Sequence, residues 1–596
     1  MTCRERALSE DYVDILTDFE ITPELLAGQE IDMCTIPAGQ DFYVSYIHKS
    51  VLPEWGAGTV YFTAQCFGLM SEETESFERK GVHAAQNVLR EEFDLFALNN
   101  TGIRQTQLPP LSLTGQGVVM GFLDTGIRYE EEVFRYSDGS SRILAVWDQT
   151  IQDGEPPEGQ IFGTEYTKEE LDAALLSDNP RAVVPTTDTV GHGTALASVA
   201  AGSAVLGGGA TEDITRIAGR DSFLGAAPDC MIVVVRLREA KQYLRQQQLI
   251  PKAAHAYSES DILLALKYLN GFAVSLRRPL VVCFGLGTSR GAHTGDTILS
   301  RYMQNMLETR SRAIVVCGGN EGGSAHHFEG QTCIRRGEAY EDVEIRVAER
   351  VEGFIAEVWG RIPQLYTVSV ISPSGESFPD GSGILGQDLN HTFLYEKTRI
   401  NINYNVVEEG SGDERIVVRF EKPTAGIWTI RVFGVGECTG EAYNVWLPIR
   451  EFLTADTYFL RPTPYVTMTV PAYASEIISV TTYNDENNSF WAESGRGFGR
   501  DGGIRPDMAA PGVDIPTITG RMTGSSMAAA LTAGAAAQFM QWAVVERNDE
   551  YVFGRDVCNY LIRGAIREED ITYPSREWGF GRLNIAHTFE VMRRLR

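Results

Sequence analysis

Residues 117–127 read Gly117-Val-Val-Met-Gly-Phe-Leu-Asp124-Thr-Gly-Ile127. A short apolar run of β-forming residues is typical of a buried parallel strand, and this run stops at an acid followed by a Thr-Gly turn. Open α/β sheets carry their chemistry at the carboxyl ends of their strands, which is where Asp124 is expected to lie. Asp124 is therefore a candidate to orient an imidazole and stabilise its charged form. The alternative is an acid that only caps a turn.

Two later stretches supply candidate partners for Asp124. Residues 191–202 read GHGTALASVAAG and place His192 at the start of a helix of small residues. Residues 523–534 read TGSSMAAALTAG and place Ser526 at the start of another such helix. A helix start offers unpaired backbone N–H groups and a positive dipole end, and both can stabilise an oxyanion. The alternatives are a structural histidine and an ordinary serine cap.

The chain order Asp124, His192, Ser526 distinguishes between folds. Unrelated folds hold these three residue types in different orders, and this order is that of subtilisin, not of chymotrypsin or the α/β-hydrolases. With its DTG, HGT and GSSMA boxes the chain resembles the subtilase family of serine endopeptidases. Three more stretches agree with the family: LGAAP at 224–228, RPDMAAPG at 505–512 and WGFGRLNI at 578–585. The resemblance implies an α/β fold, namely the subtilisin-like three-layer fold with a mostly parallel sheet.

The resemblance also implies roles for particular residues. Ser526 would attack a peptide carbonyl while His192 takes its proton, and Asp124 would hold the imidazole tautomer. Residues 314–322, IVVCGGNEG, resemble the oxyanion-hole segment, so Asn320 would donate a side-chain N–H beside the Ser526 backbone N–H. Residues 281–288 correspond to the strand that pairs with the substrate backbone. The expected substrate-binding residues are Gly285, Leu286, Gly287, Gly318 and Gly319.

Cofactor chemistry is not needed for this reaction. Acyl transfer by a serine requires no metal or organic cofactor. Some subtilases carry structural calcium, but no acidic loop here is specific enough to nominate ligands.

The spacing of the three candidates predicts an inserted domain. Ser526 follows His192 by 334 positions, which is more than a compact protease domain needs. From 331 to 453 the αβ alternation gives way to short strand-like runs between turn signals, which is typical of a β-sandwich or jelly roll. The predicted division is a propeptide-like segment at 1–100, protease at 101–330, the insertion at 331–453 and protease again at 454–596.

The N-terminal segment is predicted to be a small α+β unit. Residues 42–47 and 59–63 have strand-like patterns, and 71–98 has a helical one. Subtilases commonly carry a propeptide that plugs the active site, so the resemblance makes this segment a partner of the protease. Whether and where it is cut is left open by the sequence.

An insertion at this point, together with the long segment between Asp124 and His192, resembles the clostridial germination-specific (Csp) subgroup. Active members of that subgroup cleave the precursor of a spore cortex-lytic enzyme, and others have lost the triad and act as sensors. The predicted function is therefore a serine endopeptidase, self-processing and activating a germination zymogen. The alternative is a catalytically silent scaffold for binding or sensing. The family's usual proline four residues after the nucleophile is Ala530 here, and its effect on turnover is left open.

Composition narrows the partners and the compartment. The 596 residues include 80 acidic and 52 basic ones, a net charge of −28, which argues against nucleic acid as a partner. Nine cysteines without C-x-x-C spacing indicate reduced thiols, neither a disulfide framework nor a zinc site. The chain start lacks a secretory pattern, so a cytoplasmic, spore-associated protein is expected. The apolar run at 528–545 is predicted to be a buried core helix and not a membrane span.

Overall fold

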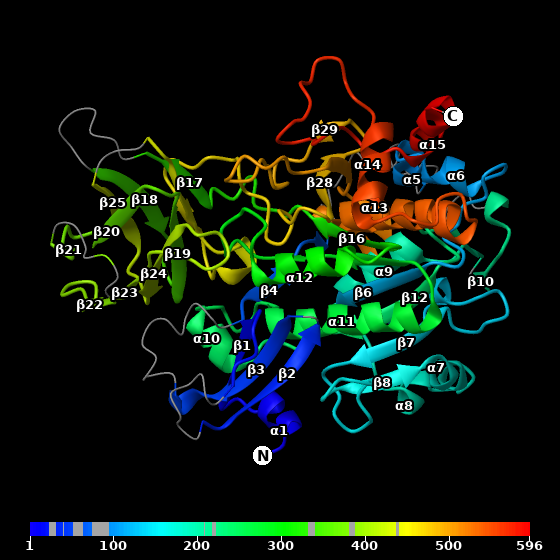
Figure 1. The fold of residues 1–596 in the computed structure, drawn as a ribbon, viewed down its shortest axis with the longest axis horizontal. Helices are drawn as coiled ribbons and strands as arrows, with labels where there is room; N and C mark the ends of the chain where they lie inside the picture. The colour runs from blue at the N-terminus through cyan, green and yellow to red at the C-terminus, as the bar shows by residue number, and fades with distance from the viewer. Residues whose placement is uncertain are drawn as a thin grey trace, which may run out of the picture.

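The largest sheet lies at the centre of the molecule (Figure 1). The computed structural model describes residues 1–22, 31–39, 41–51, 64–73, 95–207, 209–216, 222–331, 340–380, 385, 388–436 and 440–595. Its central strand order is β29-β28-β16-β14-β6-β12-β7-β8, with β30 also paired to β28. All pairs are parallel except the outer ones to β29 and β8. The strands are β6 (Val119–Asp124), β7 (Ile143–Asp148), β8 (Thr164–Thr167), β12 (Met231–Arg236), β14 (Leu280–Phe284), β16 (Arg312–Cys317), β28 (Ile478–Asn484), β29 (Ser489–Phe490) and β30 (Met508–Pro511).

Helices cover this sheet to give a three-layer fold, as predicted. One helix pair, α9 and α13, packs together, and α11 and α12 form a second pair over β6, β12 and β16. Gly121 on β6 lets α11 approach closely, since a Cβ there would lie 3.0 Å from Leu269 Cδ1. Further helices lie at the sheet edges and ends. The helices are α5 (Phe96–Asn100), α6 (Ile103–Gln107), α7 (Lys168–Leu175), α8 (Pro180–Val183), α9 (His192–Ala201), α10 (Gln242–Gln247), α11 (Glu259–Leu276), α12 (Ile298–Leu307), α13 (Ser525–Met540), α14 (Gly554–Gly564) and α15 (Ile585–Leu595).

Helix α13, like α9, is buried along its whole length. Every one of its residues is buried, Ala530 included. Gly534 lies so close to Ala226 that a Cβ on the glycine would approach the alanine Cβ to 2.1 Å. Among the described residues, only Ser525–Val545 is long and apolar enough to cross a membrane, and most of this stretch is buried. Its burial and small residues fit the predicted core helix.

Two antiparallel sheets pack face to face between β16 and β28 in the sequence (Figure 1). Aromatic side chains fill the space between them, including Phe420, Trp428 and Tyr443. One sheet has the order β17-β26-β19-β24-β23-β22 and the other β21-β20-β25-β18-β27. The strands are β17 (His327–Gly330), β18 (Tyr340–Val347), β19 (Gly353–Gly360), β20 (Leu365–Ile371), β21 (Ser377–Phe378), β22 (Leu389–Thr392), β23 (Arg399–Asn405), β24 (Glu414–Glu421), β25 (Gly426–Val435), β26 (Tyr443–Trp446) and β27 (Thr457–Phe459).

The sandwich is therefore wider than the predicted insertion. Strand β17 precedes residue 331 and pairs with β26, while β27 follows residue 453 and pairs with β18. Both are short edge strands, so their sequences lack the long alternating pattern by which the inner strands are recognised.

Glu414 is expected to make the stability of the sandwich depend on pH. Its side chain is fully buried, and burial raises the pKa of Glu414 to about 8, opposed only by the Tyr366 N–H that the carboxyl accepts at 2.6 Å. A raised carboxyl pKa means that the folded state holds a proton that the unfolded state loses above about pH 4.5. We therefore expect the free energy of unfolding to fall between pH 5 and pH 8. Each unit of pKa shift corresponds to about 1.4 kcal/mol, so Glu414→Gln should remove a few kcal/mol of this loss. Denaturant unfolding at both pH values measures this.

The control for that prediction is Glu352→Gln, at an exposed position of the same sandwich. It should unfold with the pH dependence of the wild type. Equal pH dependence in Glu414→Gln and wild type would contradict the buried-proton explanation.

The N-terminal segment forms a sheet of its own. Its order is β1-β3-β2, all antiparallel, and α1 packs on it. The predicted strand at 42–47 is present as β3, whereas 59–63 lies outside the described residues. Of the predicted helix at 71–98, residues 74–94 also lie outside them, but Glu72–Glu73 is a strand, because it pairs with β32 and not with its own chain neighbours. The elements are α1 (Cys3–Leu8), β1 (Tyr12–Thr17), β2 (Met33–Gly39), β3 (Phe42–His48), β4 (Cys66–Leu69), β5 (Glu72–Glu73) and β32 (Gly520–Thr523).

The prediction that all cysteines are reduced is wrong for Cys3 and Cys34. A disulfide joins them, with the Cα atoms 5.6 Å apart, because α1 packs against β2. Cys333 and Cys438 lie outside the described residues. The other five are buried free thiols: Cys66, Cys230, Cys283, Cys317 and Cys558.

Candidate active site

The structure brings Asp124, His192 and Ser526 together in one hydrogen-bonded row. Asp124 lies at the carboxyl end of β6, and His192 and Ser526 lie in the first turns of α9 and α13. His192 Nδ1 is 2.7 Å from Asp124 Oδ1, and its Nε2 is 3.1 Å from Ser526 Oγ. All three side chains are buried. The row has the order that a serine nucleophile, a general base and an orienting carboxylate require.

Small residues make this approach possible. A Cβ on Gly193 would lie 2.3 Å from the Gly126 carbonyl oxygen and 3.1 Å from Asp124 Cβ. The Thr125 N–H donates to Asp124 Oδ1 at 2.7 Å, and the Gly193 N–H donates to Thr125 Oγ1 at 2.9 Å. The Asp-Thr-Gly and His-Gly-Thr boxes therefore pack and hydrogen-bond directly to each other. This packing fixes the His192 imidazole against the Asp124 carboxylate.

The electrostatics favour a base that is readily protonated. Burial lowers the pKa of His192, while the charge and hydrogen bond of Asp124 raise it, and the pKa lies above the ordinary value of 6.5. With Nδ1–H donated to Asp124, the lone pair of Nε2 faces the Ser526 hydroxyl. That hydroxyl also has the Gly285 carbonyl oxygen within reach, at 3.1 Å.

Asn320 lies three residues after the end of β16 and beside the start of α13. Its Oδ1 accepts the Ser525 N–H at 3.0 Å, so the amide nitrogen is the end of the side chain that remains to donate. The neighbouring Gly319 N–H donates to Ser525 Oγ at 3.0 Å. Ser525 thus helps to hold the loop that carries Asn320.

The N-terminal segment runs through this site. The Ser526 backbone N–H donates to the Met70 carbonyl oxygen at 3.1 Å, and the Met70 N–H donates to the Gly285 carbonyl oxygen at 3.2 Å. Met70 is buried, and so is Ser71 after it. The carbonyl group of the Met70–Ser71 peptide bond therefore lies against the backbone N–H of Ser526.

Strands on both sides of this bond hold the segment in place. Before it, β4 is the middle strand of a three-stranded sheet between β13 (Tyr257–Ser258) and β15 (Leu286–Gly287). After it, β5 pairs with β32, the strand that leads into Ser526. The chain thus crosses the site in an extended form, as a substrate of a protease with β-strand recognition would.

The predicted substrate-binding residues divide into two groups. Gly285, Leu286 and Gly287 meet the N-terminal segment, with Leu286 opposite Leu69 and Gly287 opposite Gly68. Gly318 and Gly319 instead belong to the loop between β16 and Asn320. The Gly318 N–H donates to Val480 O at 2.7 Å, and the Gly318 carbonyl oxygen accepts the Thr469 N–H at 3.1 Å.

Glu451 is a site residue that sequence reasoning missed. Its Oε2 accepts the Leu69 N–H at 3.0 Å. Burial raises the pKa of Glu451 to about 8, against the opposing effects of His192 and of the Leu69 N–H. It stands outside every family box, 75 residues before Ser526, so no local pattern could have found it.

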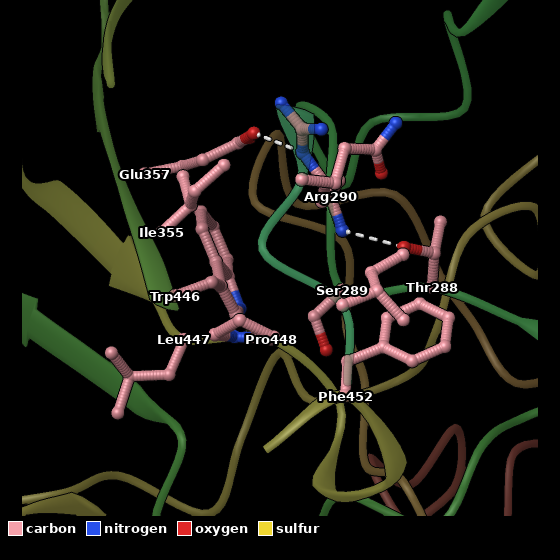
Figure 2. Close-up of a pocket in the computed structure, with 11 residues that line it drawn as sticks. Thr288, Ser289, Arg290, Ile355, Glu357, Trp446, Leu447, Pro448 and Phe452 are labelled. Carbon is pink, nitrogen blue, oxygen red and sulfur yellow. Dashed lines mark hydrogen bonds and ion pairs between the residues drawn. The ribbon is translucent and has the colours of Figure 1, made fainter. Parts of the chain in front are cut away.

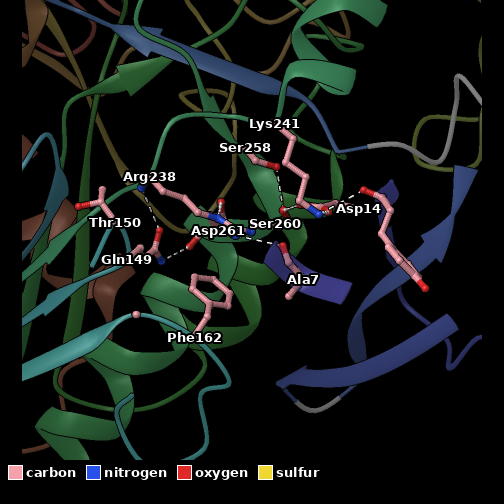
Figure 3. Close-up of polar contacts among 12 residues, drawn as sticks. Ala7, Asp14, Gln149, Thr150, Phe162, Arg238, Lys241, Ser258, Ser260 and Asp261 are labelled. Carbon is pink, nitrogen blue, oxygen red and sulfur yellow. Dashed lines mark hydrogen bonds and ion pairs between the residues drawn. The ribbon is translucent and has the colours of Figure 1, made fainter. Parts of the chain in front are cut away.

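A buried polar cluster docks the N-terminal segment on the protease (Figure 3). Asp14 on β1 pairs with Lys241 at 2.7 Å and accepts the Ser260 hydroxyl at 2.8 Å. Arg238 donates to the Ala7 carbonyl oxygen at 3.0 Å and pairs with Asp261 at 2.7 Å. These contacts involve residues 7–14 and do not depend on the Met70–Ser71 bond.

Among the described residues, no group of three or more His, Cys, Asp or Glu side chains could hold a metal ion. The pair of His326 with Glu321, at 2.6 Å, has no third such partner within the part of the chain that the structure describes.

Comparison with known proteins places the chain in a family. The sequence profile of the subtilase family (Peptidase S8) matches residues 115–341 and 463–581. The solved structure of the CspB protease of Clostridium perfringens is 28% identical with a TM-score of 0.71, over 84% of this chain and 98% of that one. Two maturation proteases, prenylagaramide PagA and patellamide PatA, are 14% identical with TM-scores of 0.37 and 0.36, over 82% and 80% of this chain and 97% of each of theirs. No curated protein matches the chain.

These findings confirm the predicted subtilisin-like fold with an inserted β domain and the predicted likeness to the Csp type. The family profile covers both protease parts and more than half of the residues. The chain belongs to the subtilase family and is a subtilisin-like serine endopeptidase.

Proposed function

We propose that this protease uses Asp124, His192 and Ser526 as its catalytic triad, with Asn320 and the Ser526 N–H as oxyanion donors, and that its first substrate is its own Met70–Ser71 bond. The observation that carries the proposal is the 3.1 Å hydrogen bond from the Ser526 N–H to the Met70 carbonyl oxygen. In acyl transfer that oxygen becomes the oxyanion, and it already has one donor.

The steps follow from the contacts. Ser526 Oγ attacks the Met70 carbonyl carbon and His192 Nε2 takes the hydroxyl proton. The C–N bond to Ser71 then breaks, His192 gives the proton to the leaving amine, and residues 1–70 remain as an ester on Ser526. Water, deprotonated by His192, hydrolyses that ester. A new amino terminus at Ser71 and a carboxylate at Met70 result.

The N-terminal segment is proposed to act as a propeptide that stays bound after cleavage. The Asp14–Lys241 pair and the Arg238–Ala7 hydrogen bond support this, since neither needs an intact chain at residue 70. Asp14 is 5% exposed, so its pair with Lys241 is little weakened by solvent.

Mass spectrometry of the full-length protein tests self-processing. The wild type should yield two chains, one ending at Met70 and one beginning at Ser71, that co-elute on gel filtration. The Ser526→Ala variant should stay whole. A Ser71 terminus in both proteins would point to an outside protease, and an uncut wild type that retains its fold would overturn the proposal.

The pH dependence of self-cleavage reports on His192. Its raised pKa means that the imidazole becomes protonated, and unable to accept the Ser526 proton, as pH falls through a value above 6.5. We expect the cleavage rate to drop on the acid side with a midpoint above that value. Asp124→Asn removes the group that raises the pKa while burial still lowers it, so the midpoint should move to lower pH. A midpoint that does not move would contradict the assigned pair.

A second substrate is proposed from the likeness to the Csp subgroup. The 28% identity to the CspB protease over 84% of this chain supports a germination role, in which the enzyme cleaves the precursor of a spore cortex-lytic enzyme from a cytoplasmic or spore-associated location. Incubating the processed enzyme with such a precursor, beside Ser526→Ala, tests this. The catalytically silent alternative is not favoured, because the hydrogen-bonded row of Asp124, His192 and Ser526 is complete.

A further inference from the structure

Residues 449–452, which connect the sandwich strands β26 and β27, lie over the N-terminal strand β4. We call them the cover segment; they include the short helix η5 (Arg450–Phe452). Ile449 and Phe452 are buried and belong to the core of the protease. The cover segment thus encloses the strand on a side that neither β13 nor β15 occupies.

The cover segment leaves no room for a side chain at Gly68. A Cβ there would lie 2.6 Å from Ile449 Cδ1, 2.8 Å from Glu451 Oε2 and 3.3 Å from Phe452 Cε1. Favourable contacts between carbon atoms are about 3.5–4.0 Å, so the nearest atoms would overlap a methyl group. Gly68 is also paired with Gly287 in the sheet, and this pairing fixes the position of its backbone relative to the cover segment.

The cover segment cannot easily move aside, because its backbone is anchored. The Arg450 N–H donates to Glu321 Oε1 at 3.0 Å, and the other oxygen of Glu321 binds His326 at 2.6 Å. The Arg450 guanidinium contacts Ser324 Oγ at 3.1 Å and Glu493 Oε2 at 2.5 Å. These contacts tie the segment to the loop that follows Asn320.

The side chains of the segment are constrained as well. Ile449 Cδ1 and Glu451 Oε2 are tips of flexible side chains, and either one alone could rotate. Both close on the same point, however, and Glu451 Oε2 also accepts the Leu69 N–H at 3.0 Å. A methyl group at position 68 would therefore displace Ile449 inside a packed core and break the bond that Glu451 makes to the strand.

We propose that the cover segment makes this protease selective for glycine at the third residue before the cleaved bond, with Ile449 as the excluding side chain and Glu451 as a positioning residue that holds the next N–H. This inference rests on the proposed cleavage at Met70–Ser71. It extends to other substrates, which must enter the same strand position between β13 and β15. The inserted sandwich thereby contributes to substrate choice, since it delivers the segment to the cleft.

The test measures self-cleavage of the full-length chain over time, with the Ser71 terminus identified by mass spectrometry. Gly68→Ala should slow cleavage by about ten- to hundredfold, the range expected for one methyl group forced into a packed site. Gly68→Ala combined with Ile449→Ala should recover most of the rate. Gly271→Ala on α11, which adds the same methyl group at a position with no neighbouring atom within 4 Å, is the matched control and should be cut like the wild type.

The outcomes separate this inference from the proposed function. An uncut wild type would defeat self-processing itself. A wild type and a Gly68→Ala variant that are cut at equal rates would defeat only the glycine requirement, and failure of Ile449→Ala to restore cleavage would show that the cover segment is not the cause.

A second measurement covers the case in which Gly68→Ala does not fold. Two peptide aldehydes, acetyl-Phe-Gly-Leu-Met-H and acetyl-Phe-Ala-Leu-Met-H, compete with a fluorophosphonate probe for Ser526 in the processed wild type. The glycine peptide should protect Ser526 at a concentration about ten- to hundredfold lower. Equal protection would overturn the inference.

Discussion

Replacing His192 with alanine should slow cleavage of the Met70–Ser71 bond by roughly 10⁶-fold. The imidazole is the only base within hydrogen-bond reach of Ser526 Oγ among the described residues, since the other acceptor, Gly285 O, is a carbonyl oxygen. Without it the hydroxyl must attack with its proton still in place. The rate is measured from the appearance of the Ser71 terminus in freshly folded protein.

The matched control for this change is His391→Ala. His391 also pairs with a carboxylate, Glu376, at 2.9 Å, but lies in the sandwich. Its loss removes an imidazole and its hydrogen bond to a carboxylate without touching the active site, so self-cleavage should keep the wild-type rate. If both variants stop cleavage, the effect of His192→Ala reflects misfolding and not lost catalysis.

The second large effect is expected at Glu357, which joins the sandwich to Arg290, three residues after the end of β15. Glu357 on β19 is 2% exposed and pairs with Arg290 at 2.7 Å (Figure 2). It also pairs with Arg415 at 2.5 Å. Burial raises the pKa of Glu357, the two guanidinium groups lower it, and the net pKa lies well below its ordinary value. Removing one member of a buried ion group leaves the charge of the others uncompensated, so Glu357→Ala should lower the free energy of unfolding by about 3–5 kcal/mol.

Denaturant unfolding of Ser526→Ala forms, which stay uncut, gives this difference free of processing. The matched control is Glu421→Ala in the same sandwich, where Glu421 pairs with Arg419 at 2.9 Å and is about a third exposed. A partly exposed pair is worth about 1 kcal/mol or less. Equal losses in the two variants would contradict a special role for the buried group.

The three-layer fold could be predicted from sequence because its determinants are local. Each determinant can be recognised within about ten residues of sequence. They are the strand ending at Asp124, the Gly-His-Gly helix start and the small residues around Ser526. Their chain order then selects one architecture. The sandwich was recognisable for the same reason, through the alternation in its inner strands.

Contacts between distant parts of the chain could not be read in this way. Glu451 meets Leu69 across 382 positions, and neither residue stands in a recognisable motif. The Cys3–Cys34 bridge depends on how α1 packs on β2, which no spacing rule encodes. Glu72–Glu73 looked helical because its neighbours in sequence are charged and regularly spaced, but its partner is β32. In each case the deciding neighbour is supplied by tertiary structure.

The passage of β4 and β5 through the active site has a kinetic consequence. The bond beside Ser526 belongs to the same molecule as Ser526, so no encounter between two molecules precedes its hydrolysis. Processing should therefore be first order in protein, with a half-time that stays constant on dilution. A protein substrate that arrives later must instead compete with the severed strand, which the docked segment keeps at a high effective concentration. The onset of activity toward other proteins is then set by release of that strand and not by the number of enzyme molecules.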